Sequence, residues 1–429
     1  MTAPTPAGPA PRGWRGGWRD GLSYGAMGLP LAFVALPLYV QLPNHYATAF
    51  GVPLATLGLL LLAARLLDAV ADPLIGRLAD GWLTRGQALA VAGGAAVVLA
   101  AGFHALFFPA WREGTGLLLW CALALAITYL AYSVLAVLHQ AWGARLGGDE
   151  GQRARIVGWR EGLALAGVLV ASVLPALAGF GVASAVFALA LAVAWLAWRQ
   201  APAALAAGPR GPVPSLLAPL AHGPFRRLLA VFLVNGIASA VPATLVLFFV
   251  RDRLQLPTWE PLFLAAYFAA GALSMPLWVR LVGALGLKGA WLLGMLLAVL
   301  AFVWAALLGA GQGLAFVAVC VASGVALGAD LVLPGALLAG VVQRAGHAGT
   351  MEGAYFGWWN FAGKLNLALA AGLALPLLQQ LGYTPGQRDD AGLHALTVAY
   401  CLLPCVLKLA AAGLLAWLLP RRSTDPETA

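Results

Sequence analysis

Long apolar runs limit what this chain can fold into more than any other feature of its sequence. A transmembrane helix needs about 20 consecutive, mainly apolar residues. Twelve stretches meet that requirement, near residues 22–42, 54–78, 88–109, 116–138, 157–178, 181–198, 228–250, 260–280, 289–309, 313–341, 354–379 and 393–419. A turn signal at Gly179 to Gly181 separates the fifth run from the sixth. The sequence therefore predicts an all-α membrane protein with 12 transmembrane helices.

Composition excludes several other classes of protein. Hydrophobic residues make up 62% of the chain and charged residues only 10%, against about 25% charged residues in soluble domains. A soluble globular protein or a disordered chain needs more polar groups than this. The four cysteines all lie in apolar runs, without metal-type or redox-type spacing: Cys121, Cys320, Cys401 and Cys405. We therefore expect no disulfide framework, no cofactor and no metal beyond a coupling ion.

The positions of the basic residues predict the orientation of the chain in the membrane. A net charge of +9 would suit nucleic acid binding in a soluble protein, but here the basic residues lie between apolar runs. If the N-terminus is cytoplasmic, the outer loops hold four of the 25 basic residues: Arg112, Arg251, Arg253 and Arg388. Three more lie inside the spans (Arg65, Lys364 and Lys408), and the remaining 18 face the cytoplasm. The positive-inside rule then predicts two cytoplasmic termini and a lipid bilayer, not nucleic acid, as the surrounding partner.

The chain divides into two similar halves. The sequence Pro73-Leu-Ile-Gly-Arg77 is followed eight residues after its arginine by Arg85, and Pro276-Leu-Trp-Val-Arg280 is followed at the same distance by Lys288. Two parallel repeats of six spans are typical of the major facilitator fold. We predict six-helix bundles over residues 22–198 and 228–419, joined by a proline-rich cytoplasmic linker over 199–227. Cytoplasmic tails are predicted over residues 1–21 and 420–429.

The second span contains three charged residues on one helix face. Spacings of three and four residues place Arg65, Asp68 and Asp72 above one another. Asp68 is then about 15 Å, and Asp72 about 9 Å, from the cytoplasmic end of the helix. Charges at such depth are costly and are functional candidates by default. We predict that the two carboxylates bind a cation or share a proton; a structural ion-pair network with Arg65 is the alternative.

Lys364 lies in the eleventh span, about 15 Å from its cytoplasmic side. That depth is level with Asp68 and is too great for the side chain to reach water by snorkelling. We therefore predict that Lys364 faces Asp68 and Asp72 across the interface between the two halves. Lys408 is a further lysine inside a span, and the sequence assigns it no role.

Charged residues near the cytoplasmic ends of the spans form a second candidate group. Ion pairs between the halves would make an inner gate that breaks when the protein opens inward, while solvated loop charges are the alternative. The predicted gate residues are Asp80, Arg77, Arg85, Asp330 and Glu352.

A third group consists of candidates for contact with a solute. Aromatic rings stack on sugar faces, although they also form belts at membrane interfaces. A lone histidine is more often a hydrogen-bonded structural residue than a proton carrier. The candidate solute-binding residues are Arg160, His139, Tyr355, Trp358 and Lys364.

Two motifs at these positions resemble those of the glycoside–pentoside–hexuronide:cation symporters, the melibiose permease-like family of the major facilitator superfamily. The first motif is Arg65-x-x-Asp68-Ala-x-x-Asp72-Pro73-x-x-Gly76. The second runs through Asp330-x-x-x-Pro334, Thr350-x-Glu352-Gly353-x-Tyr355-x-Gly357, Phe361-x-x-Lys364 and Leu381-Gly382-Tyr383. Arg160 stands in the place of the family's helix-five arginine. The resemblance covers residues 60–425.

The resemblance implies uptake of a solute coupled to H⁺ or Na⁺, with Asp68 and Asp72 as cation ligands and Lys364 beside them. Ala71 stands where the family often has asparagine, which weakens a sodium site more than a proton site because sodium needs several oxygen ligands. Leu135 and His139 occupy the part of the fourth span where melibiose carriers hold the sugar with a carboxylate.

Together these features predict a monomeric, cation-coupled symporter of a sugar or glycoside in the bacterial inner membrane. The alternatives are a carrier of a lipid or organic acid, and an uncoupled facilitator. An enzyme is not expected, because the loops do not exceed about 30 residues and carry no His–acid catalytic motif.

Overall fold

A computed structural model describes residues 13–204, 215–384, 386 and 389–418 of the chain. The described residues form helices, turns and loops without a β-strand, which confirms the predicted all-α class. The predicted C-terminal tail lies outside the described residues, as do parts of the predicted N-terminal tail and linker, together with Arg388.

The N-terminal bundle begins with a first span made of four consecutive segments. They are α1 (Trp18–Gly25), α2 (Gly28–Leu36), the π-helical segment η1 (Pro37–Gln41) and α3 (Leu42–Phe50). The bundle continues with α4 (Leu54–Thr84), α5 (Ala88–Phe107), α6 (Gly114–Arg145) and α7 (Glu150–Trp198).

The C-terminal bundle likewise combines long α-helices with short π-helical segments. It starts with α8 (Ala218–Ala221), α9 (Gly223–Phe248), the π-helical η2 (Phe249–Arg253) and the 3₁₀ turn η3 (Pro257–Trp259). Then follow α10 (Glu260–Phe302), η4 (Val303–Leu307), α11 (Gly313–Arg344) and α12 (Glu352–Gln380). The last span contains α13 (Asp390–Thr397), the π-helical η5 (Val398–Leu402) and α14 (Leu403–Leu418).

Two of the helices are too long to be single spans. α7 has 49 residues and α10 has 43, so each would extend well beyond the hydrocarbon core, which is about 30 Å thick. Each contains a glycine with positive φ, Gly179 at 78° and Gly286 at 69°, where the chain turns back. The break at Gly179 is the one that the turn signal predicts. With α7 and α10 counted as two spans each, the described helices are consistent with the predicted twelve spans.

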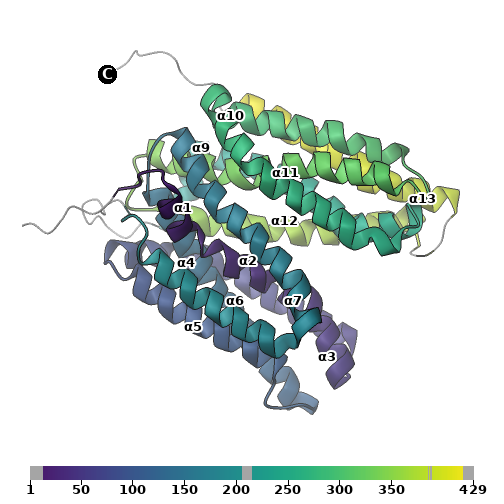
Figure 1. Cartoon of the computed structure of the whole chain (residues 1–429), viewed down its shortest axis with the longest axis horizontal. Coiled ribbons are helices and arrows are strands. Elements are labelled where there is room, and N and C mark those ends of the chain that lie inside the picture. The colour runs from purple at the N-terminus through teal and green to yellow at the C-terminus, as the bar shows by residue number, and fades with distance from the viewer. Residues whose placement is uncertain (1–12, 205–214, 385, 387–388, 419–429) are drawn as a thin grey trace, which may run out of the picture.

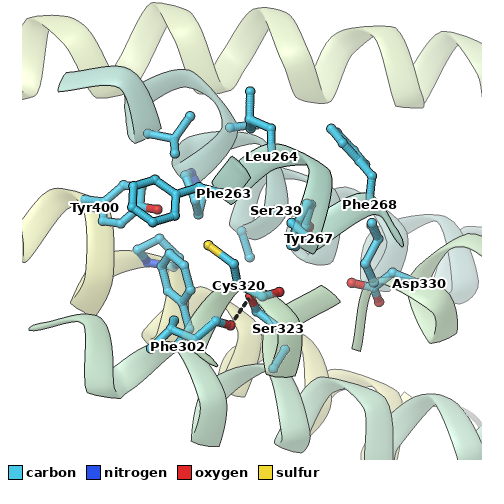
Figure 2. Close-up of a pocket in the computed structure, with 18 of the residues that line it drawn as sticks. Ser239, Phe263, Leu264, Tyr267, Phe268, Phe302, Cys320, Ser323, Asp330 and Tyr400 are labelled. Carbon is cyan, nitrogen blue, oxygen red and sulfur yellow. Dashed lines mark hydrogen bonds between the residues drawn. The ribbon is translucent and has the colours of Figure 1, made fainter. Parts of the chain in front are cut away.

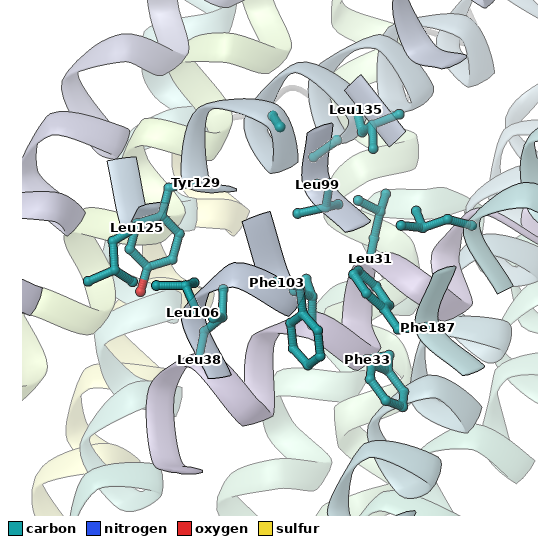
Figure 3. Close-up of a cluster of buried hydrophobic side chains, with 14 of the residues drawn as sticks. Leu31, Phe33, Leu38, Leu99, Phe103, Leu106, Leu125, Tyr129, Leu135 and Phe187 are labelled. Carbon is teal, nitrogen blue, oxygen red and sulfur yellow. The ribbon is translucent and has the colours of Figure 1, made fainter. Parts of the chain in front are cut away.

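Aromatic and branched side chains fill the interior of the N-terminal bundle (Figure 3). Phe187 of α7 stacks on Phe33 of α2, with ring centroids 5.4 Å apart, and contacts Phe103 of α5 at 4.8 Å. Lipid tails are as apolar as these side chains, so close packing, not removal from water, holds such helices together. The packed interior makes each bundle a firm support for the polar residues on its inner side.

The two bundles meet at one end and diverge at the other (Figure 1). They lie close together at the end that holds α1, and they separate toward the end that holds α3 and α13. Residues of α4 contact the start of α12 at the closed end, where Asp80 accepts hydrogen bonds from Gly353 and Ala354. The chain is thus a two-bundle membrane protein that is closed on one side.

Candidate cation and solute site

A cluster of buried charges joins the two bundles. Lys364 of α12 lies between two carboxylates of α4, with its Nζ 2.7 Å from Asp68 Oδ2 and 2.8 Å from Asp72 Oδ2. Ser133 of α6 completes the cluster, because it donates a hydrogen bond to Asp68 Oδ1 at 2.7 Å and accepts one from Lys364 at 2.8 Å. The contact expected from the equal depths of Lys364 and Asp68 is therefore present.

Three glycines let the helices of this cluster approach each other closely. A Cβ atom on Gly76 of α4 would lie 2.2 Å from the backbone oxygen of Gly353, and one on Gly357 of α12 would lie 2.5 Å from the backbone oxygen of Asp72. Larger residues at these positions would force the backbones apart. The Gly76 and Gly353 positions belong to the two motifs, so the same sequence segments supply both the charges and the close helix contact.

The cluster retains an excess of negative charge and of hydrogen-bond acceptors. Two carboxylates share one ammonium group, and Asp68 and Asp72 are almost completely buried. Although Asp72 forms an ion pair with Lys364, neither of its carboxylate oxygens accepts a hydrogen bond of good geometry from the described residues. A buried, under-coordinated carboxylate favours uptake of a proton or a small cation. The arrangement is chemically suited to reversible cation binding.

Arg65 lies one helical turn from Asp68 on α4, on the side away from Asp72. Its side chain is exposed and acts electrostatically on Tyr129 of α6. It therefore contributes positive charge near the cluster while Lys364 lies between the two carboxylates.

Arg160 of α7 lies close to α11 of the other bundle, and its role as a solute contact stays a prediction. Its Nε donates to Glu161 Oε1 at 2.9 Å, and its Nη2 lies 3.8 Å from where a Cβ of Gly335 in α11 would be. Tyr132 of α6 is close enough to Asp68, Asp72, Arg160 and Glu161 to be influenced by their charges. Tyr132 was not predicted as a site residue; one signal for it in the sequence is its position next to Ser133 on the fourth span.

A second buried cluster lies at the closed end of the molecule. Arg145 Nε lies 2.9 Å from Glu352 Oε2, and its Nη2 lies 3.4 Å from Asp80 Oδ1. Asp80 also accepts hydrogen bonds from the N–H groups of Gly353 at 2.7 Å and Ala354 at 2.9 Å. Residues of both bundles are thus joined through two carboxylates and one guanidinium. Asp80 and Glu352 lie where the gate prediction puts them.

Burial raises the pKa of Asp80 to about 7, even though the N–H groups of Ala354 and Gly353 and the charge of Arg145 act in the opposite direction. Asp80 lies near the C-terminal end of α4, beyond its apolar run. The hydrogen bonds and the charge of Arg145 therefore offset only part of the cost of burying this carboxylate.

Two predicted gate arginines are not part of this cluster. Arg85 follows the end of α4 and is exposed, and Arg77 is half-buried on the same helix. Neither forms an ion pair or side-chain hydrogen bond to the other bundle that is seen among the described residues. Arg145 takes their place, because the end of α6 directs its side chain toward the start of α12. The prediction for Arg77 and Arg85 is therefore wrong in this state of the protein.

The placement of Asp330 in the gate is also wrong. Asp330 lies within α11 inside the C-terminal bundle, where Lys408 Nζ is 2.5 Å from its Oδ2. Its Oδ1 accepts hydrogen bonds from Trp291 at 2.9 Å and Asn235 at 3.2 Å. Asp330 is 14 residues from the end of α11 at Arg344, about 21 Å at 1.5 Å per residue, so it lies too deep to reach Glu352.

His139 packs inside the N-terminal bundle and does not face the region between the bundles. Its ring is fully buried, stacks on Tyr24 at 4.4 Å and lies 4.9 Å from Trp198. Its Nε2 is 2.7 Å from the backbone oxygen of Tyr24. The prediction of His139 as a solute ligand is therefore wrong, and the structural alternative describes it better.

Tyr355 and Trp358 lie at the closed end of the molecule, where they form structural contacts. The fully buried Tyr355 has its hydroxyl 2.8 Å from His347 Nδ1, and its ring meets Phe225 edge to face. Trp358 donates from its indole nitrogen to the backbone oxygen of Leu216 at 3.0 Å. Both side chains are directed toward segments that precede α9 or α12, so their prediction as solute ligands is wrong in this state.

Further contacts between the bundles occur at the same end. Arg153 of α7 donates to Gln343 Oε1 of α11 at 2.5 Å. The backbone N–H of Leu287, next to the turn at Gly286, donates to Glu150 Oε2 at 2.7 Å. Separate contacts therefore connect α7 to both α10 and α11.

The chain is similar to known transport proteins. A family model described as MFS/sugar transport protein matches residues 21–420. The Inner membrane symporter YicJ of Escherichia coli is 31% identical over 139 residues, which is 30% of this chain and 28% of the relative. The Putative glycoside/cation symporter YagG of the same organism is 28% identical over 155 residues, 36% of this chain and 34% of the relative. These matches thus span about a third of each curated relative.

Solved structures share the fold at low sequence identity. A bacterial homologue of the iron transporter ferroportin in an outward-facing state superposes with a TM-score of 0.69 and 16% identity, over 92% of this chain and 99% of the other. The major facilitator superfamily transporter FucP in the outward conformation gives a TM-score of 0.64 and 10% identity, over 94% and 98%. At these identities the likeness concerns the fold alone.

Proposed function

The chain belongs to the MFS/sugar transport protein family, and from this premise we propose that it is a symporter that couples a small organic solute to H⁺ or Na⁺. It is a multi-pass membrane transporter and not an enzyme. The observation that carries the coupling proposal is the position of Lys364 between Asp68 and Asp72. These residues come from different bundles, so a change in their charge state affects the contact between the bundles directly.

The proposed coupling follows from charge balance in this cluster. With both carboxylates ionised and Lys364 protonated, the site carries one net negative charge in a buried environment. A proton or sodium ion on Asp72 neutralises that excess and weakens the hold of the carboxylates on Lys364. Cation binding then shifts the balance between the conformations of α4 and α12, which is the differential binding that coupling requires. Because Ala71 supplies no side-chain oxygen, a proton suits the site better than sodium.

The proposed orientation follows from the basic residues. Both termini are cytoplasmic and the protein lies in the inner membrane of a bacterium. The end closed by Asp80, Arg145 and Glu352 is then the inner gate, and the diverging end in Figure 1 opens to the outside. In alternating access these ion pairs break when the halves rock around the solute.

A sugar or glycoside is the proposed solute. The printed names of the two curated relatives include a symporter and a putative glycoside/cation symporter. The Arg160–Glu161 pair offers hydrogen-bond donors and acceptors near the cation cluster, which suits a hydroxylated molecule. A lipid or an organic acid as solute, and uncoupled transport, are the alternatives. We propose a single chain as the working unit, since each bundle of this chain contributes to the cluster.

The coupling is tested with the variant Asp72→Asn in sealed vesicles. We expect uptake of the solute driven by a proton or sodium gradient to be lost, because the amide cannot take up a proton or a cation in place of the carboxylate. Exchange of labelled for unlabelled solute, which needs no net cation movement, should continue. Imposing the proton and sodium gradients separately identifies the ion.

Glu113→Gln is the matched control, since Glu113 is an exposed acid in an outer loop. Its uptake should equal that of the wild type. Unchanged gradient-driven uptake in Asp72→Asn would refute the role of this carboxylate in coupling.

A further inference from the structure

The C-terminal bundle contains a pocket that is separate from the cation cluster. Its volume is about 370 Å³, and it is lined by α9, α10, α11, η5 and α14. That volume lies in the range of pockets that hold small organic molecules. Leu36 of α2 also lines it, so the pocket borders the N-terminal bundle at that point. Lys364 and the carboxylates of α4 do not belong to its lining.

One part of the pocket is aromatic and the other is polar. Figure 2 shows Phe263 and Tyr400 at one side, Asp330 at the other and Cys320 between them. Tyr400 belongs to the π-helical segment η5, and such segments are frequent at functional sites because they displace side chains from the regular helical pattern. The pocket therefore presents an apolar body that ends at a few polar atoms.

The polar part is electrically neutral and has one donor to spare. Lys408 Nζ donates to Asp330 Oδ2 at 2.5 Å and to Ser239 Oγ at 2.9 Å. An ammonium group has three N–H bonds, and the third has no hydrogen-bond acceptor among the described residues. Asp330, in contrast, accepts hydrogen bonds from Trp291 and Asn235 as well as Lys408. Lys408 therefore has one N–H that can bind an oxygen of a ligand.

The neutral charge of the Lys408–Asp330 pair determines which net charge a ligand can carry into the pocket. A carboxylate ligand would leave one net negative charge in a mainly apolar pocket, and an amine would leave one net positive charge there, because Lys408 already neutralises Asp330. Either outcome is costly in a site of low polarity. An uncharged molecule with a hydroxyl or carbonyl oxygen satisfies the remaining N–H of Lys408 at no such cost.

We propose that this pocket is a second binding site, which takes an uncharged, mainly apolar molecule through an oxygen acceptor that contacts Lys408. The aromatic side chains enclose the apolar part of the molecule, and the neutral Lys408–Asp330 pair binds its oxygen. The site does not depend on coupling at Asp72. A result that contradicts one of the two proposals therefore leaves the other unaffected.

Two native cysteines allow a direct test. Cys320 and Cys405 line the pocket, whereas Cys121 lies in the N-terminal bundle and Cys401 is fully buried outside the lining. The protein in lipid nanodiscs is treated with N-ethylmaleimide, and the modified peptides are quantified by mass spectrometry. Three probes with one phenylbutyl body are compared: 4-phenylbutanol, 4-phenylbutyrate and 4-phenylbutylamine. We expect the alcohol to slow labelling of Cys320 and Cys405 at the lowest concentration, with no change at Cys121.

The variant Lys408→Met removes the donor and keeps the length of the side chain. We expect the alcohol to protect about tenfold less well, the effect of losing a hydrogen bond to a charged group. Lys288→Met is the matched control, because Lys288 donates to the backbone oxygen of Ala416 and lies outside the lining. If Lys408→Met does not fold, Ser323→Leu serves instead, since it fills the pocket without touching the ion pair and should abolish protection.

Three results would overturn the proposal. They are equal protection by all three probes, protection by the alcohol that Lys408→Met and Ser323→Leu leave unchanged, and cysteines that N-ethylmaleimide cannot reach in the absence of any probe. Gradient-driven uptake by the wild type, measured in parallel, reports separately on the coupling proposal.

Discussion

At the scale of single residues, the two lysines inside the spans differ in the net charge of the clusters to which they belong. Lys364 neutralises one of two carboxylates, so its cluster keeps a negative charge that a cation can fill. Lys408 is matched by one carboxylate that also receives two other donors, so its pair is neutral. The same side chain is therefore part of a cation site in one place and of a neutral hydrogen-bonding site in the other.

The charge balance at Lys364 predicts a non-additive effect on stability. Lys364→Met leaves Asp68 and Asp72 buried without their cation, and removing one partner of a buried pair costs about 3–5 kcal/mol. The double variant Lys364→Met/Asp72→Asn leaves one carboxylate, which keeps its hydrogen bond from Ser133. We expect it to recover most of the loss in apparent Tm of the purified protein.

The control is Lys288→Met, which removes a half-buried lysine that donates to the backbone oxygen of Ala416 and is not paired with two buried carboxylates; it should lower the apparent Tm much less than Lys364→Met does. A double variant no more stable than the single one would contradict the view that Asp72 and Lys364 compensate each other.

At the scale of elements, glycines set the distance between α4 and α12. Gly76, Gly353 and Gly357 bring the two backbones close enough for Lys364 to reach both carboxylates. The ion pairs therefore depend on the glycines, because a wider helix separation would lengthen the distances between Lys364 and the carboxylates.

This arrangement predicts the effect of one added methyl group. In Gly357→Ala the new Cβ would lie 2.5 Å from the backbone oxygen of Asp72, so the helices must separate. We expect a loss of about 1–3 kcal/mol in stability and weaker gradient-driven uptake, measured by thermal unfolding and by transport. Gly58→Ala, on the same helix α4 with open space around the position, should leave uptake unchanged and should not lower stability, since alanine favours the helix. Equal behaviour of the two variants would disprove the packing argument.

Elements also show how far the sequence predicts this structure. The apolar runs fix the spans, and the glycine at 179 marks a turn because it lies between two complete runs. Gly286 likewise lies between two runs, 260–280 and 289–309, and Arg280 and Lys288 mark the break around it. The depth of a charge along a helix follows from residue counting, which is why Lys364 was matched to Asp68. The same counting puts Asp330 14 residues before the end of α11 at Arg344, too deep for the gate. Its pairing with Lys408 depends on the direction of the side chain around the helix, which residue counting does not give.

At the scale of the whole molecule, contacts between the bundles concentrate at one end. Arg145, Asp80 and Glu352 form a buried cluster there, and the pairs Arg153–Gln343 and Glu150–Leu287 join α7 to the other bundle. The opposite end diverges in Figure 1. The distribution of these bonds, not the interior of either bundle, therefore sets the balance between the two ends.

Removing the central cation of this cluster should shift that balance. We expect Arg145→Ala to favour opening of the closed end by about a hundredfold, because two buried carboxylates lose a partner worth about 3 kcal/mol. A cysteine placed at Val157, which is buried beside Gly335 of the other bundle, reports opening through its rate of maleimide labelling.

Arg85→Ala in the same Val157→Cys background is the control, since Arg85 is exposed at the end of α4. It should label as slowly as the parent. Equal labelling of the Arg145→Ala and Arg85→Ala proteins would show that Arg145 does not hold the two bundles together.

The first turn of α12 is completed by a residue that does not belong to its own half. The N–H groups of Gly353 and Ala354 find their acceptors on Asp80, and helix N-termini leave such groups unsatisfied unless something caps them. A C-terminal half produced alone would therefore have a frayed helix end, and an N-terminal half produced alone would have a carboxylate without these donors. Each half thus supplies hydrogen-bond partners that the other half lacks. Two halves that are translated separately should therefore associate in the membrane through the bonds between Asp80 and the N-terminus of α12.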